Sequence, residues 1–446
     1  MSCNGAHRTH QPRAHRVLEL FAGVGGFRFA LEEANRHLSV GCAQHYEVVW
    51  ANQWEPGARK QNAARVYEAR WGHAPVNRNL FEVLTDAEEM ARVDALAPTM
   101  LVAGFPCQDY SVAKPASRSA GIEGKKGVLW WAIHNLLQAR ISAGRPLEVV
   151  LLENVDRLLA SPAACPDRDF AVILGSLQAL GYAVAWQVVN AAEYGYPQRR
   201  RRVFITAVHR SSPECTHWVG AKRAPAEWLA GSSPLAAGLP VALSGDLVAF
   251  DVPAGAYAAQ QSYNTGRAGR TRFATVGVCI DGTAWTAQAK AAPTSEMRQH
   301  ARTLGDVVAK TGSVPSAYYL SEASLERWRY LKGAKSILRT KADGHEYTYC
   351  EGAVPFPDPL DRPSRTIITS EGGSGASRTR HAVAAAGGRL RRLTPEELEE
   401  LNGFPRGFTD AEGLSASQRA FLMGNALVSG VVTRIAVALA SGQTMK

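Results

Sequence analysis

The sequence predicts an α/β protein with an open, mostly parallel β-sheet and a second, smaller, irregular domain. Three observations support this prediction. Short apolar strands alternate with periodic helices over the first 210 residues. A glycine-rich turn joins the first strand to the first helix. Beyond residue 210 the long periodic helices are missing, and 446 residues are enough for two domains.

The strands are recognised as continuous apolar runs, the pattern of strands that are buried on both faces. We expect them over residues 16–21, 48–54, 99–105, 147–155, 182–190 and 201–208. Helical periodicity is found over residues 27–38, 126–141 and 170–180. Because strands and helices alternate, the helices should cover both faces of the sheet.

Two further helices are expected near the end of the chain. Thr394, Pro395 and Glu397 form a helix start, with a capping threonine, a first-turn proline and a capping-box glutamate. This helix should stop near Asn402, where Gly403 follows. The last apolar helix is expected over residues 426–440.

The composition narrows the function classes. A net charge of +10 and a pI near 9.3 favour a polyanionic partner. No apolar run reaches the roughly 18 residues of a membrane span, and the polar N-terminus does not resemble a secretory signal. The seven cysteines form no CxxC pair. We therefore expect a cytoplasmic, reduced protein without a metal site.

The glycine-rich turn, FAGVGGF, lies where a nucleotide-type cofactor would bind. Its spacing is G-x-G-G, which disfavours NAD, whose enzymes use G-x-G-x-x-G. A tight structural turn is the alternative. The second strand ends in Asn52, Gln53 and Trp54, and the indole of Trp54 suits either stacking on a ligand or a place in the core.

Cys107 ends a buried strand, at the carboxyl edge where α/β proteins bind ligands. The residues that follow are rich in Gly, Ser and Lys, a composition that suits a mobile basic lid. Glu153 ends the next long strand at the same edge. The run QRRRR (198–202) enters the last strand, so alternate arginines should face the cleft and favour a thiolate there. A buried structural cysteine is the alternative.

Together these motifs resemble the DNA cytosine-5 methyltransferases of bacterial restriction–modification systems. The resemblance covers about residues 1–208 and 360–440, in the order of the family. It is carried by FAGVGGF, GFPCQDYS, ENV, QRRRR, RPSRTI (362–367) and GNALVSGVV (424–432).

The resemblance implies a Rossmann-like, class I S-adenosylmethionine-dependent methyltransferase sheet. It also implies four parts: a flexible basic tail (1–15), a catalytic and cofactor-binding domain (16–209), a target-recognition domain (210–390) and a C-terminal segment returning to the catalytic domain (391–446). The substrate implied is double-stranded DNA, the enzyme is expected at the nucleoid, and a cognate restriction endonuclease is its functional partner. A monomer is expected because one flipped base needs only one subunit.

The same resemblance assigns roles to individual residues. Cys107 would attack C6 of a flipped-out cytosine, Glu153 would hold N3, and Arg200 and Arg202 match the arginines of the family, Arg202 binding O2. The residues implied in S-adenosylmethionine binding are Glu19, Phe21, Gly23, Val24, Gly25, Gly26, Gln53, Trp54, Asn79, Leu80, Leu129 and Asn425. Those implied in DNA contact are Gln108, Ser111, Arg267, Arg270 and Arg272.

Two positions depart from the family pattern. Gln53 stands where an acidic residue usually accepts both ribose hydroxyls, and Asn79 stands where an aspartate often contacts the adenine amino group. Both departures bear on cofactor binding and leave the catalytic residues intact.

Two other functions are compatible with parts of the sequence. A tRNA-methylating branch shares the DNA-type motifs, but it usually has a smaller second domain than the roughly 150 residues here. RNA enzymes with a nucleophile in the later strand motif are disfavoured because ENV holds no cysteine. A non-catalytic DNA-binding module would have no need of Cys107, Glu153 and Arg202.

Overall fold

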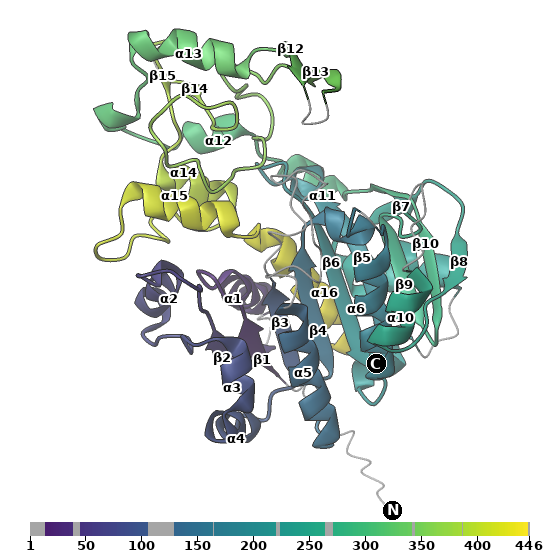
Figure 1. Ribbon diagram of the computed structural model, residues 1–446. Coiled ribbons are helices and arrows are strands. Elements are labelled where there is room, and N and C mark those ends of the chain that lie inside the picture. The colour runs from purple at the N-terminus through teal and green to yellow at the C-terminus, as the bar shows by residue number, and fades with distance from the viewer. Residues whose placement is uncertain are drawn as a thin grey trace, which may run out of the picture.

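The computed structural model describes residues 14–38, 45–105, 129–163, 165–219, 224–263, 271–340, 344–385 and 387–444. A nine-stranded sheet runs through the molecule in the order β2-β1-β3-β4-β6-β5-β9-β10-β8 (Figure 1). The six predicted strands are confirmed to within two residues at each end. They are β1 (His15–Leu20), β2 (Tyr46–Asn52), β3 (Met100–Gly104), β4 (Val149–Asn154), β5 (Tyr182–Asn190) and β6 (Arg201–His209).

The first half of the sheet is parallel, as predicted: β1 pairs in parallel with β2 and β3, and β3 with β4. β6 is inserted antiparallel between β4 and β5. The connection from β5 to β6 explains this reversal. It contains only a short 3-10 turn, Ala191–Tyr194, whereas a parallel pair needs a crossover of a dozen or more residues.

The sheet continues beyond the predicted boundary at residue 210. The strands β8 (Val248–Asp251), β9 (Val276–Ile280) and β10 (Thr283–Ala287) extend it antiparallel from β5. Each is only four or five residues long, so its apolar pattern is too short to stand out from the surrounding loops. The end of the sheet therefore does not coincide with the predicted domain boundary.

Helices cover both faces of the sheet, as expected. One face packs against α3 (Leu80–Thr85), α4 (Ala87–Ala95), α5 (Leu129–Ser142), α6 (Arg168–Ala179) and α10 (Ala256–Tyr263). The other packs against α1 (Gly26–Leu38), α7 (Pro213–Trp218), α9 (Pro234–Gly238) and α16 (Ser429–Thr444).

The last helix, α16, is part of the sheet's own core. The Thr433 hydroxyl donates to the Ala30 carbonyl on α1 (3.1 Å), and the Tyr46 hydroxyl donates to the Ala436 carbonyl (2.7 Å). The C-terminal segment thus packs against the first elements of the chain.

Residues 302–393 form a separate body, here called the upper lobe, which lies above α14 (Pro395–Leu401) and α15 (Ala416–Asn425) in Figure 1. Its elements are α12 (Leu304–Val308), α13 (Glu322–Lys332), β12 (Lys335–Thr340), β13 (Glu346–Glu351), β14 (Val383–Ala384) and β15 (Leu390–Arg391). The predicted capping box of Thr394 and Glu397 is confirmed at the start of α14. The helix α13 was not predicted, because only Trp328 and Lys332 of its eleven residues are buried and its apolar pattern is correspondingly weak.

The remaining elements are short. They include α2 (Asn62–Trp71), α11 (Ser295–Gln299) and the small sheet of β7 (Val241–Leu243) with β11 (Ala289–Ala291). Within the described ranges, no single helix is long and apolar enough to cross a membrane. One pair bent by 41°, Ala416–Asn425 with Ser429–Gly442, meets the criterion only when the two helices are taken together.

Candidate active site at the carboxyl edge of the sheet

The glycine-rich turn connects β1 to α1 through left-handed backbone conformations. Phe21, Gly23 and Gly25 have φ angles of +53°, +58° and +81°. A Cβ atom at Gly25 would lie 2.2 Å from the ring of Trp71, so only glycine permits this packing. A Cβ at Gly23 would meet nothing within 4 Å. The turn therefore packs against the protein at Gly25 and faces open space at Gly23.

Gln53 supports this turn from the end of β2. The Gly23 backbone N–H donates to Gln53 Oε1 at 2.7 Å, and Gln53 is buried. The side-chain carbonyl of Gln53 is thus engaged by the protein, and its amide NH₂ group is what remains for a ligand hydroxyl. The neighbouring Trp54 is 36% exposed, which is compatible with ring stacking and excludes a place in the core.

Asn79 also uses its side-chain oxygen within the protein. It caps α3 by accepting from the Phe81 N–H (3.1 Å), so its NH₂ group is the part left to meet a base. Leu80 and Val24 are buried, Leu129 at the start of α5 is half-buried, and Asn425 at the end of α15 is exposed.

Glu19 is a fully buried carboxylate beneath the turn. Its Oε1 accepts from the Arg28 N–H at 3.1 Å, while its Oε2 has no hydrogen-bond partner in the described structure. Burial raises the pKa of Glu19 to about 7, although hydrogen bonding and the charge of Arg28 act in the opposite direction.

These residues fit S-adenosylmethionine. The cofactor carries an ammonium group for which a buried, unpartnered carboxyl oxygen at Glu19 is a suitable acceptor. Its adenine needs an aromatic face, which Trp54 exposes. The open side of Gly23 allows close approach of a ligand to the backbone.

The strand that leads to Cys107 ends beside Glu153. Gly104, the last residue of β3, is in register with Glu153 on β4, and a Cβ there would be 3.6 Å from Glu153 Oε2. The Asn154 side chain donates to the Phe105 carbonyl (3.3 Å) and joins the two strand ends. Cys107, Gln108 and Ser111 lie outside the described residues.

Arg202 pairs directly with Glu153. The distance from Arg202 Nε to Glu153 Oε1 is 2.9 Å, and both side chains are mostly buried. Arg201, on the other face of β6, pairs with Asp156 at 2.8 Å. Alternation along β6 therefore directs Arg202 toward the acid, as the sequence predicted.

Arg200 differs from the prediction that it faces the cleft. It is buried, and its guanidinium donates to the carbonyls of Ile367 (3.2 Å) and Gly424 (3.1 Å). It precedes β6, so the alternation of that strand does not apply to it. Arg200 thus connects the entrance of β6 to two segments far along the chain.

The segment RPSRTI is part of the same connection. Gln198 accepts from the Ile367 N–H (3.1 Å) and donates to Asn402 Oδ1 (2.8 Å), and the Arg199 N–H donates to the Ser364 carbonyl (2.9 Å). Pairing of residues 198 and 364 therefore attaches the upper lobe at the carboxyl edge of the sheet.

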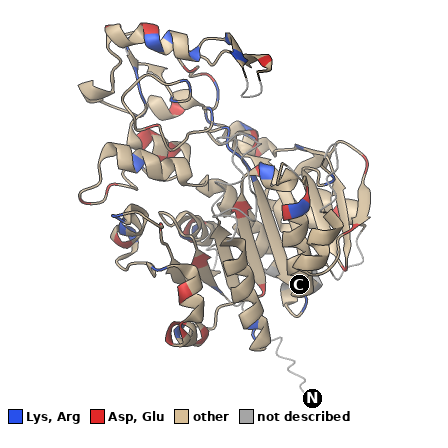
Figure 2. Cartoon of the chain, viewed as in Figure 1, with Lys and Arg blue, Asp and Glu red and all other residues tan. Residues whose placement is uncertain are grey.

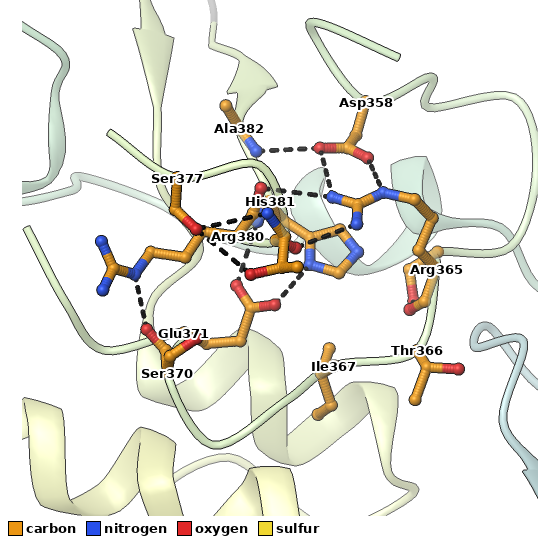
Figure 3. Close-up of polar contacts among 12 residues, drawn as sticks. Asp358, Arg365, Thr366, Ile367, Ser370, Glu371, Ser377, Arg380, His381 and Ala382 are labelled. Atoms are coloured by element: carbon orange, nitrogen blue, oxygen red, sulfur yellow. Dashed lines mark hydrogen bonds and ion pairs between the residues drawn. The ribbon is translucent and has the colours of Figure 1, made fainter. Parts of the chain in front are cut away.

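Figure 3 shows a network of polar contacts around Arg365, the fourth residue of RPSRTI. Arg365 binds Asp358 through two nitrogens, at 2.6 and 3.2 Å, and donates to the carbonyls of Thr379 and Arg380. Glu371 accepts from both the backbone N–H and the ring of His381. This network has no local signal in the sequence, because these residues are up to 23 positions apart and are brought together only in the fold.

Of the three arginines predicted to contact DNA, only Arg272 lies within the described residues. Arg267 and Arg270 lie outside the described residues. Arg272 packs its guanidinium over the rings of Phe250 and Tyr263, at 5.8 and 5.2 Å from their centroids. This packing gives Arg272 a structural role in the described structure.

A hollow of about 1460 Å³ lies elsewhere, between α1, α9, α11, α14 and α16. Arg36, Glu400 and Arg434 are among its lining residues, and none of the predicted site residues lines it. The predicted chemistry belongs to the carboxyl edge and not to this hollow.

Comparisons with known proteins agree with the geometry. The model of the C-5 cytosine-specific DNA methylases matches residues 15–441. The chain is 38% identical to Type II methyltransferase M.Sau3AI of Staphylococcus aureus, over 94% of both chains. It is 31% identical to M.NgoBI of Neisseria gonorrhoeae over 45% of this chain and 52% of that protein.

Solved structures of methyltransferases share the fold. The Entamoeba histolytica methyltransferase EhMeth has a TM-score of 0.56 at 13% identity, covering 96% of this chain and 98% of its own. The S. pombe Dnmt2 methyltransferase has a TM-score of 0.52 at 15% identity with the same coverage. The chain therefore belongs to the C-5 cytosine-specific DNA methylases, and it is a DNA (cytosine-5-)-methyltransferase with S-adenosylmethionine as its methyl donor.

Proposed function

We propose that this enzyme methylates C5 of a cytosine flipped out of a short duplex DNA sequence, through a covalent bond between Cys107 and C6. The observation that carries the proposal is the Glu153–Arg202 ion pair at 2.9 Å, beside the strand that leads to Cys107. A thiolate, an acid and a fixed cation at one strand edge are what addition to a pyrimidine ring needs.

The roles of the side chains follow from the chemistry of cytosine. The Cys107 thiolate adds to C6, and electron density moves to C5 and N3. Glu153 in its protonated form donates to N3 and offsets the charge that develops there. Arg202, adjacent to Glu153, binds the carbonyl O2.

S-adenosylmethionine, when bound, would supply the electrophilic methyl group that C5 takes up, its S–CH₃ bond breaking as the neutral thioether leaves. A base then removes the C5 proton, the Cys107–C6 bond breaks, and 5-methylcytosine is released. Because the target ring is stacked in the duplex, the base must leave the helix before Cys107 can reach it. Gln108 and Ser111, next to Cys107, are proposed to close behind it.

We propose that residues of the glycine-rich turn, together with residues from neighbouring elements, bind the cofactor. Phe21, Val24 and the three glycines form the backbone cradle, and Glu19 accepts from the ammonium group. Trp54 stacks on the adenine, while Leu80, Leu129 and Asn425 complete the walls. Gln53 and Asn79 contribute their NH₂ groups, because their oxygens are engaged within the protein.

The biological setting is proposed from a relative. M.Sau3AI, which matches almost the full chain, is named a Type II methyltransferase. We propose that this enzyme is likewise the modification partner of a restriction endonuclease, that it acts in the cytoplasm at the nucleoid, and that it works as a monomer, because one flipped base needs one subunit.

The test is base-resolution cytosine methylation in a methylation-free bacterial host that expresses the full chain. Cys107→Ser is expected to abolish methyl transfer and to leave cofactor binding intact, because serine is a far weaker nucleophile. The matched control is Cys165→Ser, which changes a half-buried cysteine outside the proposed site and should retain activity.

Methylation at one short motif, lost only in Cys107→Ser, is the expected result. Undiminished turnover in Cys107→Ser would refute the assignment of Cys107 as the nucleophile. Unmethylated DNA with methylated tRNA in the same cells would favour the tRNA branch instead.

A further inference from the structure

The upper lobe carries a two-stranded ribbon that pairs with no other described strand. β12 and β13 form an antiparallel sheet of two strands, with Lys335 opposite Glu351 and Thr340 opposite Glu346. Nine of its twelve residues are exposed. A two-stranded hairpin is at best marginally stable alone, so this one needs support at its base.

The base of the ribbon is firmly held. Arg378 donates to the carbonyls of Leu331, Gly333 and Gly352, which flank the two strands. Lys335 pairs with Glu351 (3.4 Å) and lies over the ring of Tyr330 (4.9 Å). The base therefore has partners within the lobe.

The outer part of the ribbon presents apolar, aromatic and cationic groups to solvent. Ile337, Leu338 and Tyr347 are 38%, 64% and 37% exposed. Arg339, Tyr347 and Tyr349 share one face, because residues directly opposite one another and those two apart point to the same side. The Arg339 guanidinium lies 3.8 Å from the centroid of the Tyr349 ring.

Arg339 is bonded differently from three arginines in the body of the lobe, although Arg389 also lies over an aromatic ring, 4.0 Å from the centroid of Tyr319. Arg365, Arg378 and Arg380 are engaged by carboxylates or backbone carbonyls. Arg339 makes no hydrogen bond or ion pair with another described residue. Stacking holds its plane in position and leaves the N–H donors at its edge available, the arrangement suited to bidentate recognition.

Charge and position indicate the occupant of this surface. Residues 302–392 carry 15 Lys and Arg against nine Asp and Glu, so much of the chain's net positive charge lies in this lobe. Figure 2 shows basic and acidic residues interspersed along α13 and the ribbon. The lobe is attached at the carboxyl edge through Arg200 and Gln198, the edge that holds the proposed active site. The major groove of B-DNA admits a two-stranded β-ribbon.

We propose that the β12–β13 ribbon enters the major groove of the substrate DNA and that Arg339 reads a guanine of the target sequence. This inference rests on the proposed function, because it requires a specific duplex substrate. It places base reading on the ribbon, whereas the sequence pointed to the GRAGRTRF segment.

The experiment uses the full-length enzyme and duplexes that contain either the mapped target or single-base variants of it. Arg339→Ala should lower kcat/KM on the target roughly 10- to 100-fold and relax discrimination at one guanine. Arg339→Lys keeps the charge but loses the planar fork, so it should lose the same discrimination. Arg210→Ala, which removes an exposed charge at the opposite edge of the sheet, is the matched control and should behave as wild type.

Two outcomes would overturn the proposal. One is unchanged kcat/KM and specificity in Arg339→Ala. The other is an equal loss on all duplexes that Arg339→Lys restores, which would indicate a phosphate contact. Cofactor binding by each variant, measured separately, shows that the fold is intact. Failure of the proposed function itself would appear earlier, as absence of any methylated DNA motif with the wild-type enzyme.

Discussion

The nine-stranded sheet and the upper lobe are stabilised by different kinds of buried side chains. In the sheet, strand residues such as Leu101, Val150 and Leu152 are completely buried between two layers of helices. In the lobe, a smaller apolar cluster that includes Leu304, Val307 and Val383 is accompanied by buried polar side chains. Lys332, Asp358 and His381 are buried there, and each has a charged or carbonyl partner.

The comparison shows how a region with few apolar residues can hold a defined shape. The two buried carboxylates of the lobe, Asp358 and Glu371, each accept at least two hydrogen bonds, as Asp358 does from Arg365 and the Ala382 N–H. A network of this kind fixes geometry but tolerates the loss of a member poorly, because the remaining charges stay buried. The sheet instead loses stability in proportion to the cavity that a substitution leaves.

The largest expected effect is a loss of stability that is confined mainly to the region in which the substitution is made. Asp358→Ala leaves Arg365 and Lys332 without their carboxylate and should cost the lobe about 3–5 kcal/mol. Leu152→Ala is the matched change in the sheet and should cost about 2–5 kcal/mol through a cavity. Hydrogen exchange should be faster mainly across residues 302–393 in the first variant and across the sheet in the second.

The pH dependence sharpens this prediction. Burial alone would raise the pKa of Asp358, but hydrogen bonding from Arg365 and the charges of His381, Arg365 and Lys332 lower it overall. Its stabilising contribution is therefore present above the ordinary aspartate pKa and is lost as the pH falls through the lowered value. The measurement is hydrogen exchange in the lobe at neutral pH. If exchange were as slow in Asp358→Ala as in the wild type, the stabilising role of the network would be contradicted.

A smaller effect is expected at Glu19, the buried carboxyl in the sheet region. Because burial raises its pKa to about 7, the folded protein binds this proton more tightly than the unfolded chain. The contribution of Glu19 to the free energy of unfolding is greatest below the pKa that this carboxyl has in the unfolded chain. It declines as the pH rises to about 7, by on the order of 1.4 kcal/mol per pH unit. Urea unfolding of Glu19→Gln should lack this decline, and an unaltered pH profile would refute the assignment.

The smallest effect is expected at Gln53. Gln53→Glu keeps an acceptor for the Gly23 N–H and replaces the NH₂ group by a second oxygen that can accept from a ribose hydroxyl. Cofactor affinity, measured by calorimetry, should rise by about 3- to 10-fold, the worth of one hydrogen bond. The methylated motif should not change; an altered motif would place Gln53 in target recognition.

The sequence by itself determined the parts whose signal is local. The apolar runs of β1 to β6, the glycine-rich turn and the capping box at Thr394 each depend on residues a few positions apart. The sequence also predicted that Glu153 and alternate arginines of QRRRR lie at one sheet edge, because strand alternation and a shared edge are properties of local pattern and topology. The ion pair between Glu153 and Arg202 itself is a finding of the structure.

Only the tertiary structure decided the rest, because those features depend on contacts between distant segments. It directed Arg200 to the carbonyls of Ile367 and Gly424, and it extended the sheet with β8 to β10. It also distinguished arginines that sequence treats alike, since Arg378 and Arg380 are engaged by carbonyls while Arg339 faces solvent. All arginines look alike in the sequence. The contacts that each one makes in the fold determine whether its charge stabilises the protein or is available to bind DNA.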